Sequence, residues 1–467
     1  MDTIKDKELR KKAEIIIKKI LSEKVTICSK TEFSEYVKLA ISKKDILLES
    51  AKRYGTPQYT LDRDLLLERA RSFFSSFRKH LDNTSFFYAF KSNDLPHLIK
   101  GLKEVGYNAD VASYFELQLA LKLGFENIIY TAPYKSEKEI GLALQHPEKV
   151  ILNIDNLDEL AMAQKNAENK KNSAKARVSF RLNTNAKITK WSKFGLSMED
   201  FKAAAKKILQ DRNFIWQGIH FHSSWNSTPR EYINNIKKIS SYLKSNFSPK
   251  ELSTLKFIDI GGGFLPEGNA TLFSATQKGE FIGKMFTGEE MLELHMPCSE
   301  KTLPIEGYAL PICKSIKENF MNFLPGIELW LEPGRFISSL PTYILLKVCA
   351  VKNGNIAVDG GINLLGSPDF ENEYAPIINI SQPSLRIQRA NIFGPMCDPH
   401  DHWGYSYFGE KCKKNDILAV MHQGAYTFST AWRWQRPIAA YVSFSGKNLE
   451  LVKREENFEE RYAGCKF

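Results

Sequence analysis

From about residue 84 to residue 335, the chain alternates short apolar runs with segments that repeat apolar residues at helical spacing. Short, nearly unbroken apolar runs are typical of strands buried on both faces of a parallel sheet. The runs expected to form strands are 86–90, 108–112, 127–132, 149–154, 176–182, 217–222, 256–263 and 327–335. Strands that alternate with helices in this number favour a (β/α)8 barrel over an open sheet.

Beyond about residue 340, short β-branched runs separated by turns are typical of an antiparallel β-domain. Residues 4–24 and 44–54 have the periodicity of helices. The first helix is expected to have an apolar side formed by Ile15, Ile16, Ile17, Ile20 and Leu21. We therefore predict an N-terminal helical extension (1–54) that partly joins the β-domain, a barrel (55–338) and a C-terminal β-domain (339–467). A less regular insertion is expected at about 265–325, before the last barrel unit.

Composition adds limits to this picture. A chain of 467 residues is too long for one ordinary core, which agrees with two domains. Seven cysteines without paired spacing, and an N-terminus without a secretory pattern, favour a reducing, cytoplasmic location. No apolar run approaches a membrane span. The net charge of +11 is spread along the chain, and no nucleic-acid-binding motif is present, so an anionic cofactor or substrate is favoured over nucleic acid.

Lys91 directly follows the strand expected at 86–90. Residues that follow barrel strands line the catalytic mouth. An amine that is partly desolvated there can lose its proton and condense with an aldehyde. The alternative is an ordinary solvated lysine at the end of a strand.

Two further strand ends carry chemistry. His220 and His222 share one side of a strand, which indicates either two satisfied histidines or one ring placed over a flat cofactor. A metal site is not favoured, because no third ligand follows at suitable spacing. Gly261, Gly262 and Gly263 allow backbone N–H groups to approach an anion, although glycine runs also form plain turns.

Glu332 ends the last expected barrel strand and is followed by Arg335. A buried carboxylate there needs a cationic partner, either the arginine or a heteroaromatic nitrogen that it keeps protonated. In the expected β-domain, Cys397 and Asp398 follow a Gly–Pro turn, and Tyr426 follows another strand. A cysteine in such a place is more often a small buried hydrophobe, and the tyrosine is either core or an anion donor.

The ordered motifs YAFKSN, DVASYFEL, KFGL, HFH, DIGGG, EPGR, GPMCD and GAYT resemble those of the fold-type III pyridoxal-phosphate decarboxylases, which act on ornithine, lysine or diaminopimelate. The resemblance extends from about residue 55 to 445. It implies an alanine-racemase-like barrel with a C-terminal β-domain, and pyridoxal 5'-phosphate as cofactor. It also implies a head-to-tail homodimer in which Cys397 and Asp398 reach the partner's active site.

The resemblance implies a role for each matching residue. Lys91 would be joined covalently to the cofactor aldehyde, His222 would stack on the ring, and Glu332 would pair with the ring nitrogen. Racemases of this architecture have an arginine in place of Glu332. Cys397 would donate a proton to the substrate Cα. The phosphate would be held by Gly262, Gly263, Arg335 and Tyr426, with Ser224 replacing the usual serine, and the cofactor would be supported by Asp110, Glu116 and Arg181.

Two departures bear on the substrate. Diaminopimelate decarboxylases usually carry Cys-Glu-Ser and a nearby arginine that grips the distal carboxylate. This chain has Cys397-Asp398-Pro399, and GSPDF at 366–370 lacks the arginine. We therefore expect a decarboxylase of an amino acid with a charged or polar tail, with a basic diamino acid such as ornithine, lysine or diaminobutyrate first.

Three alternatives stay open from the sequence. One is a decarboxylase of a larger conjugate in siderophore or antibiotic assembly, indicated by His-Ser-Ser-Trp at 222–225 and by the Trp-rich segment 431–437. Another is diaminopimelate decarboxylase itself. The third is a silent relative that binds a partner protein, although such relatives lose cofactor contacts that are present here.

Overall fold

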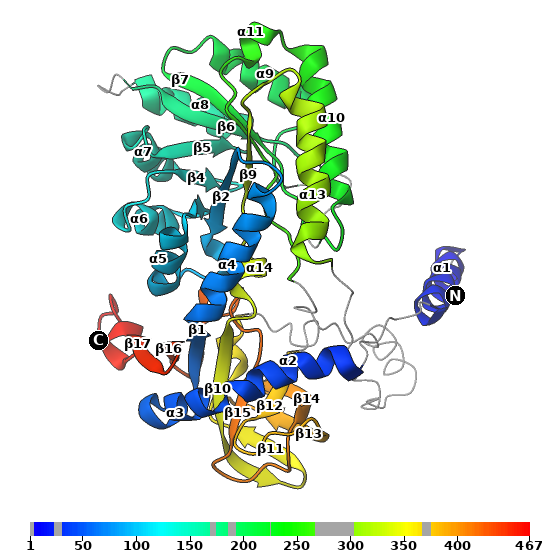
Figure 1. Cartoon of the computed structure of the whole chain (residues 1–467), viewed down its shortest axis with the longest axis vertical. Helices are drawn as coiled ribbons and strands as arrows, with labels where there is room; N and C mark the ends of the chain where they lie inside the picture. Colours follow the sequence, from blue (N-terminus) through cyan, green and yellow to red (C-terminus); the bar gives the residue numbers. More distant parts are fainter. Residues whose placement is uncertain are drawn as a thin grey trace.

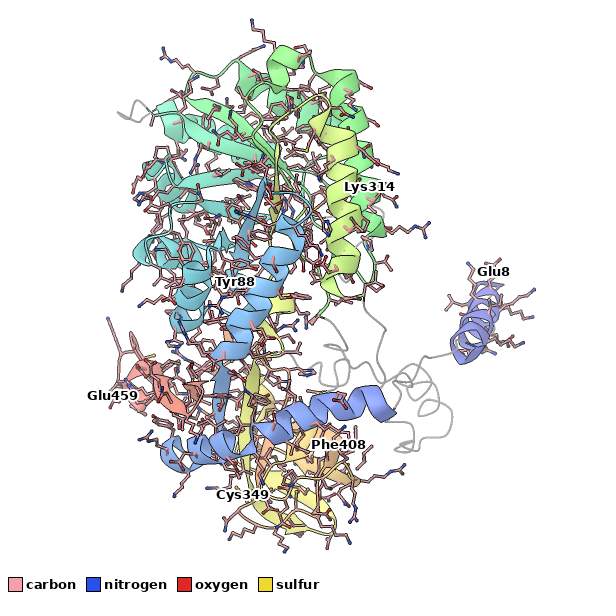
Figure 2. The ribbon with its side chains drawn as sticks, viewed as in Figure 1. Glu8, Tyr88, Lys314, Cys349, Phe408 and Glu459 are labelled. Carbon is pink, nitrogen blue, oxygen red and sulfur yellow. The ribbon has the colours of Figure 1, made fainter. Side chains whose placement is uncertain are left out.

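The computed structural model describes residues 4–22, 30–168, 174–184, 193–224, 226–266, 303–366 and 375–467. These residues form a barrel surrounded by helices and a separate large sheet beside it (Figure 1). Side chains fill both bodies: Tyr88 lies within the barrel and Phe408 within the sheet, whereas Cys349 is exposed (Figure 2). Among the described helices, none combines the length and the apolar character that crossing a membrane requires.

Eight parallel strands close the barrel in chain order, with the last strand pairing with the first. The strands are β2 (Thr84–Ala89), β3 (Asn108–Val111), β4 (Ile128–Thr131), β5 (Val150–Ile154), β6 (Ala176–Arg181), β7 (Phe214–His220), β8 (Phe257–Asp259) and β9 (Glu328–Leu331). Their near-continuous burial matches their apolar sequences, because helices cover the outside and side chains fill the inside. The predicted barrel is confirmed.

Helices cover the barrel, and several of them begin at side-chain caps, for example Asp62 before α4, Ser113 before α6 and a Ser136–Glu139 capping box before α7. They are α4 (Arg63–Arg78), α5 (Pro96–Val105), α6 (Tyr114–Lys122), α7 (Glu137–Gln145), α8 (Leu157–Glu168), α9 (Met198–Leu209), α10 (Arg230–Asn246), α11 (Pro249–Leu252), α13 (Ile305–Ile316) with the π-helical turn η4 (Lys317–Met321), and the short α14 (Arg335–Ser338).

The insertion expected at about 265–325 ends earlier than predicted, because its C-terminal part forms helix α13 (Ile305–Ile316) of the barrel. Helix α13 packs beside α4 and α10, and Tyr308, Ile312 and Ile316 are buried in the main core (Figure 1). This helix is therefore the ordinary helix before β9, although Pro311 inside it weakens its helical signal. Residues 267–302 lie outside the described part of the chain.

The inside of the barrel is closed below the carboxyl ends of the strands by an apolar layer of Phe87, Ile129, Ile151, Phe257 and Trp330. The rings of Phe257 and Trp330 stack with their centroids 3.5 Å apart. The barrel is therefore a packed core, and polar side chains at the strand ends stand on an apolar floor.

The second body is a nine-stranded sheet in the order β11-β13-β14-β12-β15-β10-β1-β16-β17. Its strands are β1 (Gln58–Asp62), β10 (Thr342–Lys352), β11 (Asn355–Val358), β12 (Ile377–Asn379), β13 (Ile387–Phe393), β14 (His402–Phe408), β15 (Ile417–Val420), β16 (Ala440–Ser445) and β17 (Asn448–Lys453). Most pairs are antiparallel, but β1–β16, β11–β13 and β12–β14 are parallel. Strand β1 belongs to this sheet, although residues 55–62 were assigned to the barrel from the sequence.

The N-terminal helices are α1 (Ile4–Ser22), α2 (Lys30–Ser42) and α3 (Lys44–Tyr54). Val37, Ala40 and Leu47 are buried in a core shared with sheet residues such as Tyr343 and Ile378, so α2 and α3 cover one face of the sheet. In α1, Ile15, one of the residues expected on an apolar side, is 62% exposed. The remaining short helical turns are η1 (Phe90–Ser92), η5 (Ile362–Leu364), η7 (Phe428–Thr430) and α15 (Phe458–Arg461).

Candidate active site

Lys91 lies in the turn η1, immediately beyond β2. Its Nζ donates a hydrogen bond of 2.8 Å to Oδ2 of Asp110 at the end of β3, and its side chain is 34% exposed. Burial alone would lower the pKa of Lys91, but Asp110 and Glu332 raise it above its ordinary value. The amine is therefore a positive charge held by carboxylates at the barrel mouth.

The β-domain fixes the backbone of this turn. The Ser429 hydroxyl donates to the Lys91 carbonyl at 2.9 Å, and the Tyr426 N–H donates to the Ser92 carbonyl at 2.7 Å. Both donors lie between β15 and β16. The position of Lys91 is thus set by both bodies of the protein.

Glu332 follows β9 and is only 1% exposed. Neither of its carboxylate oxygens accepts a hydrogen bond from a described residue, which is unusual for a buried charge. Burial would raise the pKa of Glu332, but His220 and Lys91 lower it well below its usual range. Glu332 is therefore an ionised carboxylate with room for one further cationic or N–H partner.

Two other carboxyl groups differ from Glu332. Burial and the charge of Glu332 raise the pKa of Asp110 to about 7 and that of Asp259 well above its usual range. Asp259 accepts the N–H of Gly261 at 2.8 Å. The site thus combines one ionised carboxylate with carboxyl groups that hold protons more readily.

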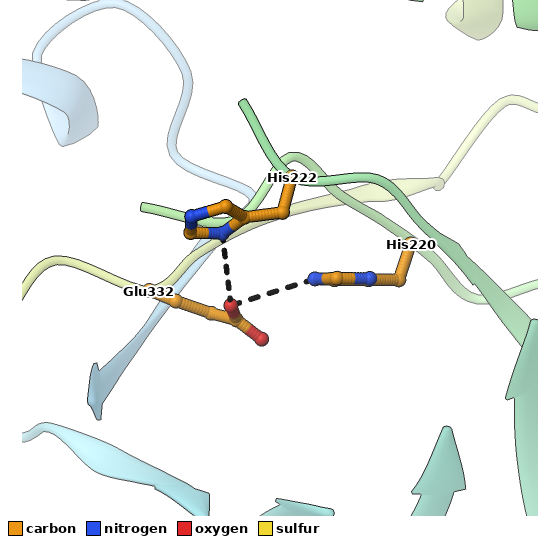
Figure 3. Close-up of side chains that lie close together, drawn as sticks. All are labelled: His220, His222 and Glu332. Atoms are coloured by element: carbon orange, nitrogen blue, oxygen red, sulfur yellow. Dashed lines mark ion pairs between the residues drawn. The ribbon is translucent and has the colours of Figure 1, made fainter. Parts of the chain in front are cut away.

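His220 and His222 both face the same carboxylate oxygen of Glu332 (Figure 3). Oε2 of Glu332 is 3.5 Å from Nε2 of His220 and 3.8 Å from Nδ1 of His222, both longer than an ordinary N–H···O bond. The Gly262 N–H donates to Nδ1 of His222 at 3.2 Å, and Nε2 is 3.0 Å from the Ser224 hydroxyl. Because a backbone N–H can only donate, these contacts assign the proton to Nε2 of a neutral ring. Burial agrees, since it lowers the pKa of His222 to about 4.

These three residues also form a cluster that could hold a metal ion, since their ligand atoms lie within 4.8 Å of one another. The lone pair of Nδ1 in His222 is already engaged by the Gly262 N–H. A metal there would have to displace that bond, so the geometry does not favour one.

The glycine loop after β8 comes close to both neighbours. A Cβ on Gly262 would lie 2.4 Å from the Glu332 carbonyl oxygen, and one on Gly263 would lie 2.0 Å from the Ser223 carbonyl oxygen. Gly263 also has φ +86°. Both positions require glycine, and the bare loop forms one wall of the site.

These elements enclose a cavity of about 270 Å³. Its polar and charged lining is formed by Lys91, His222, Ser224, Glu332, Arg335 and Tyr426, together with Gly262 and Gly263. The guanidinium of Arg335 lies 4.9 Å from the centre of the Tyr426 ring. The structure therefore brings together the residues from KSN, HFH, GGG, EPGR and GAYT that were selected from the sequence.

Arg181 and Glu116 stand behind this cavity rather than in its lining. Arg181 pairs with Asp155 at 3.5 Å, and Glu116 accepts the Ala112 N–H at 2.7 Å. Cys397 and Asp398 do not line the cavity either. Cys397 is exposed on the loop between β13 and β14, and Asp398 is 19% exposed.

Four residues near the site were not selected from the sequence: Asp259, Ser429, Phe264 and Leu265. The last two line the cavity. Asp259 carried a usable signal, because an aspartate that ends an apolar barrel strand faces the catalytic mouth. Ser429 carried none, since its contact with Lys91 depends on how the two bodies pack.

The model for the pyridoxal-dependent decarboxylase, pyridoxal binding domain, matches residues 67–339. The chain belongs to this family of decarboxylases. It is a carboxy-lyase that acts on an amino acid, and its cofactor is pyridoxal phosphate.

Relatives of this decarboxylase extend over both domains. Diaminopimelate decarboxylase of Aquifex aeolicus is 28% identical over 430 residues, which are 88% of this chain and 92% of that protein. L-glutamyl-[BtrI acyl-carrier protein] decarboxylase of Niallia circulans is 25% identical over 86% of this chain and 92% of its own. The crystal structure of lysine/ornithine decarboxylase complexed with putrescine from Vibrio vulnificus shares the fold, with a TM-score of 0.68 at 22% identity, over 86% and 98% of the two chains.

The residues of the decarboxylase fit pyridoxal phosphate. The buried Glu332 carboxylate without a hydrogen-bond donor matches a protonated ring nitrogen, and the bare glycine loop beside Arg335 matches a phosphate group. The neutral ring of His222 is suited to stack on an aromatic ring. Lys91 supplies the amine.

Proposed function

We propose that this decarboxylase removes the α-carboxylate of an amino acid with a charged or polar tail, with a basic diamino acid as the first choice. The proposed substrate class rests on Asp398, an acidic side chain next to Cys397 on an ordered loop. Hydrogen bonds from the His400 N–H and its ring lower the pKa of Asp398, so the group is an anion suited to a distal ammonium.

The bound cofactor supplies an electron sink for the pair left behind when CO2 departs. In our proposal, Lys91 holds the cofactor and Glu332 keeps the ring nitrogen protonated by its charge. Neutral His222 packs on the ring, since its proton is committed to Ser224. The backbone at Gly262 and Gly263, with Arg335 and Tyr426, binds the phosphate. Before the cofactor is joined, Asp110 positions Nζ of Lys91 through its 2.8 Å hydrogen bond.

The loop that carries Cys397 is held in place at its base. The buried Asp401 carboxylate accepts the N–H groups of Ile362 at 2.8 Å and Met396 at 2.7 Å. The side chain of Gln435 accepts the Cys397 N–H at 2.9 Å. We propose that this rigid, outward-facing loop completes the active site of a second copy of the chain, where the Cys397 thiol gives a proton to Cα.

Diaminopimelate is the next substrate to consider, because several of the relatives are diaminopimelate decarboxylases. That substrate has a distal carboxylate beside its distal ammonium, and GSPDF at 366–370 lacks the arginine that would pair with this carboxylate. A carboxylate without a cationic partner is costly to desolvate, so the chain favours a tail that ends in an ammonium alone.

The test is CO2 release from ornithine, lysine, 2,4-diaminobutyrate, arginine and diaminopimelate by the pyridoxal-phosphate-loaded enzyme. We expect the highest kcat/KM with a basic amino acid and a preferential loss of that activity in Asp398→Asn, through KM. Turnover of diaminopimelate alone would contradict the role of Asp398.

A second substrate class is a larger amino-acid conjugate. The Niallia circulans relative acts on a glutamyl group attached to a carrier protein, and Trp434 in the Trp-rich segment 431–437 is 36% exposed beside the Cys397 loop. Genes for amide-forming synthetases next to this gene, together with turnover of an amide conjugate in preference to free diamino acids, would support this class.

A further inference from the structure

A second cavity, of about 460 Å³, lies between the barrel and the β-domain, next to the chain segment that follows Lys91. The barrel contributes Asp94, three residues beyond Lys91. The β-domain contributes the turn η7 with Ser429 and the end of β17 with Lys453. This cavity shares no residue with the lining of the candidate active site.

Most of the charges around the cavity are neutralised by one another. Glu456 pairs with Arg433, and both oxygens of Glu460 accept hydrogen bonds from the Arg454 guanidinium at 2.8 and 2.9 Å. These four groups are therefore already paired and attract a charged ligand only weakly.

One carboxylate and one ammonium are left over. Within the described residues, Asp94 and Lys453 form no ion pair with each other or with any other group, and Nζ of Lys453 donates only to the Arg454 carbonyl. Both side chains are half-buried. Burial raises the pKa of Asp94 and lowers the pKa of Lys453, as expected for charges that lack a close partner.

An α-amino acid carries both missing partners on one carbon atom, an ammonium and a carboxylate. The lining also has an apolar part, formed by Phe428, Ala431 and Ile438. We propose that this cavity binds a free α-amino acid with an apolar side chain, whose ammonium pairs with Asp94 and whose carboxylate pairs with Lys453. The ligand is distinct from the polar-tailed substrate of the active site.

The cavity is connected to Lys91 through a short path. Ser429 lines the cavity and its hydroxyl donates to the carbonyl of Lys91 at 2.9 Å and that of Ser92 at 3.2 Å. Asp94 lies on the same segment. A bound amino acid would therefore restrain the segment 91–95 through Asp94 and Ser429, which makes the cavity an effector site for the enzyme.

The test is isothermal titration of the pyridoxal-phosphate-loaded enzyme with L-leucine, L-methionine, L-valine and L-phenylalanine, up to about 10 mM, a range that covers dissociation constants near ~1 mM. Two analogues of leucine serve as controls: 4-methylpentanoate lacks the ammonium, and isoamylamine lacks the carboxylate. We expect one site per chain for at least one amino acid. The analogues that lack either charge should bind at least about tenfold more weakly, because each loses one ion pair.

Variants locate the site. Asp94→Asn and Lys453→Met should each weaken binding about tenfold. Asp82→Asn, before β2, and Lys447→Met, in the β16–β17 turn, are matched exposed controls and should leave binding unchanged. Amide hydrogen exchange in residues 91–95 should slow with the amino acid in wild type and stay unchanged in Asp94→Asn.

Absence of binding by all four amino acids would overturn the proposal, as would binding that both cavity variants leave intact. Release of CO2 from leucine would instead show that the active site accepts apolar tails. That result would contradict the proposed substrate class and leave the binding data of the cavity variants to decide on the second site.

Discussion

At the scale of single residues, burial and neighbouring charges give the ionisable side chains of the candidate site different protonation states. Glu332 is ionised, His222 is neutral and Asp110 titrates with a pKa of about 7. The sequence predicted which residues meet, because each follows a barrel strand and parallel strands end at one edge. It could not predict the proton on Nε2 of His222, which depends on the Gly262 N–H from another loop.

Replacement of Glu332 by glutamine should reduce kcat by about 10²-fold or more, because a neutral amide no longer stabilises a protonated ring nitrogen. The absorption of bound cofactor should persist. Glu328→Gln is the matched control: it lies at the other end of β9, where it accepts hydrogen bonds from Ser85 and Trp330, and it should keep kcat near wild type. Equal losses in both variants would contradict the assignment.

His222 gives the stability of the cofactor-free protein a defined pH dependence. Its folded pKa of about 4 lies below its ordinary 6.5, so the folded state resists protonation. The stabilisation from the neutral ring is complete above the ordinary pKa and is lost as pH falls toward the folded pKa. Between about pH 7 and pH 5, wild type should lose about 2 kcal/mol more stability than His222→Gln. Urea unfolding measures this, and parallel pH profiles would contradict it.

At the scale of elements, apolar runs predicted all eight barrel strands, because buried parallel strands are marked by composition alone. In the β-domain, the β-branched runs beyond residue 340 do not include strands β12, β14 and β17. β12 has three residues, β14 contains a glycine, and β17 is a largely exposed edge strand with the sequence NLELVK. Such strands are defined by their neighbours in the sheet rather than by their own sequence.

The loop after β8 is the element most sensitive to one added methyl group. Gly263→Ala would place Cβ 2.0 Å from the Ser223 carbonyl oxygen at φ +86°. We expect cofactor affinity to fall by about tenfold or more, with a stability loss of about 1–3 kcal/mol. Gly141→Ala in α7, where nothing lies within 4 Å of the new Cβ, is the control and should match wild type or exceed it slightly. Cofactor titration by absorbance and thermal unfolding measure both effects.

At the scale of the whole molecule, the active site depends on two bodies that alternate along the chain. Strand β1 precedes the barrel in sequence but pairs with β10 and β16 of the sheet. The sequence prediction placed residues 55–62 in the barrel, because local pattern does not show which sheet a strand joins; that depends on contacts with residues some 280 and 380 positions later. The same long-range packing places Ser429 and Tyr426 against the Lys91 turn.

If the exposed Cys397 loop completes the site of a second copy, inactive chains should complement each other. Lys91→Ala and Cys397→Ala chains, dissociated, mixed in equal amounts and reassociated, should recover about a quarter of wild-type activity, because half of the dimers would be mixed and each would hold one intact site. Each variant reassociated alone is the control. Failure to recover activity, with mixed dimers present by native mass spectrometry, would place both residues in one chain's site.

The account rests most directly on Lys91 as the residue that holds pyridoxal phosphate. Borohydride reduction of the cofactor-loaded protein, followed by peptide mass spectrometry, should find the phosphopyridoxyl group on the peptide that contains Lys91. The Lys91→Ala variant should carry no such label, whereas Lys135→Met, which removes the buried lysine paired with Glu159 after β4, should still be labelled at Lys91 if it folds. A label on a different lysine in wild type, or no label at all, would contradict the account.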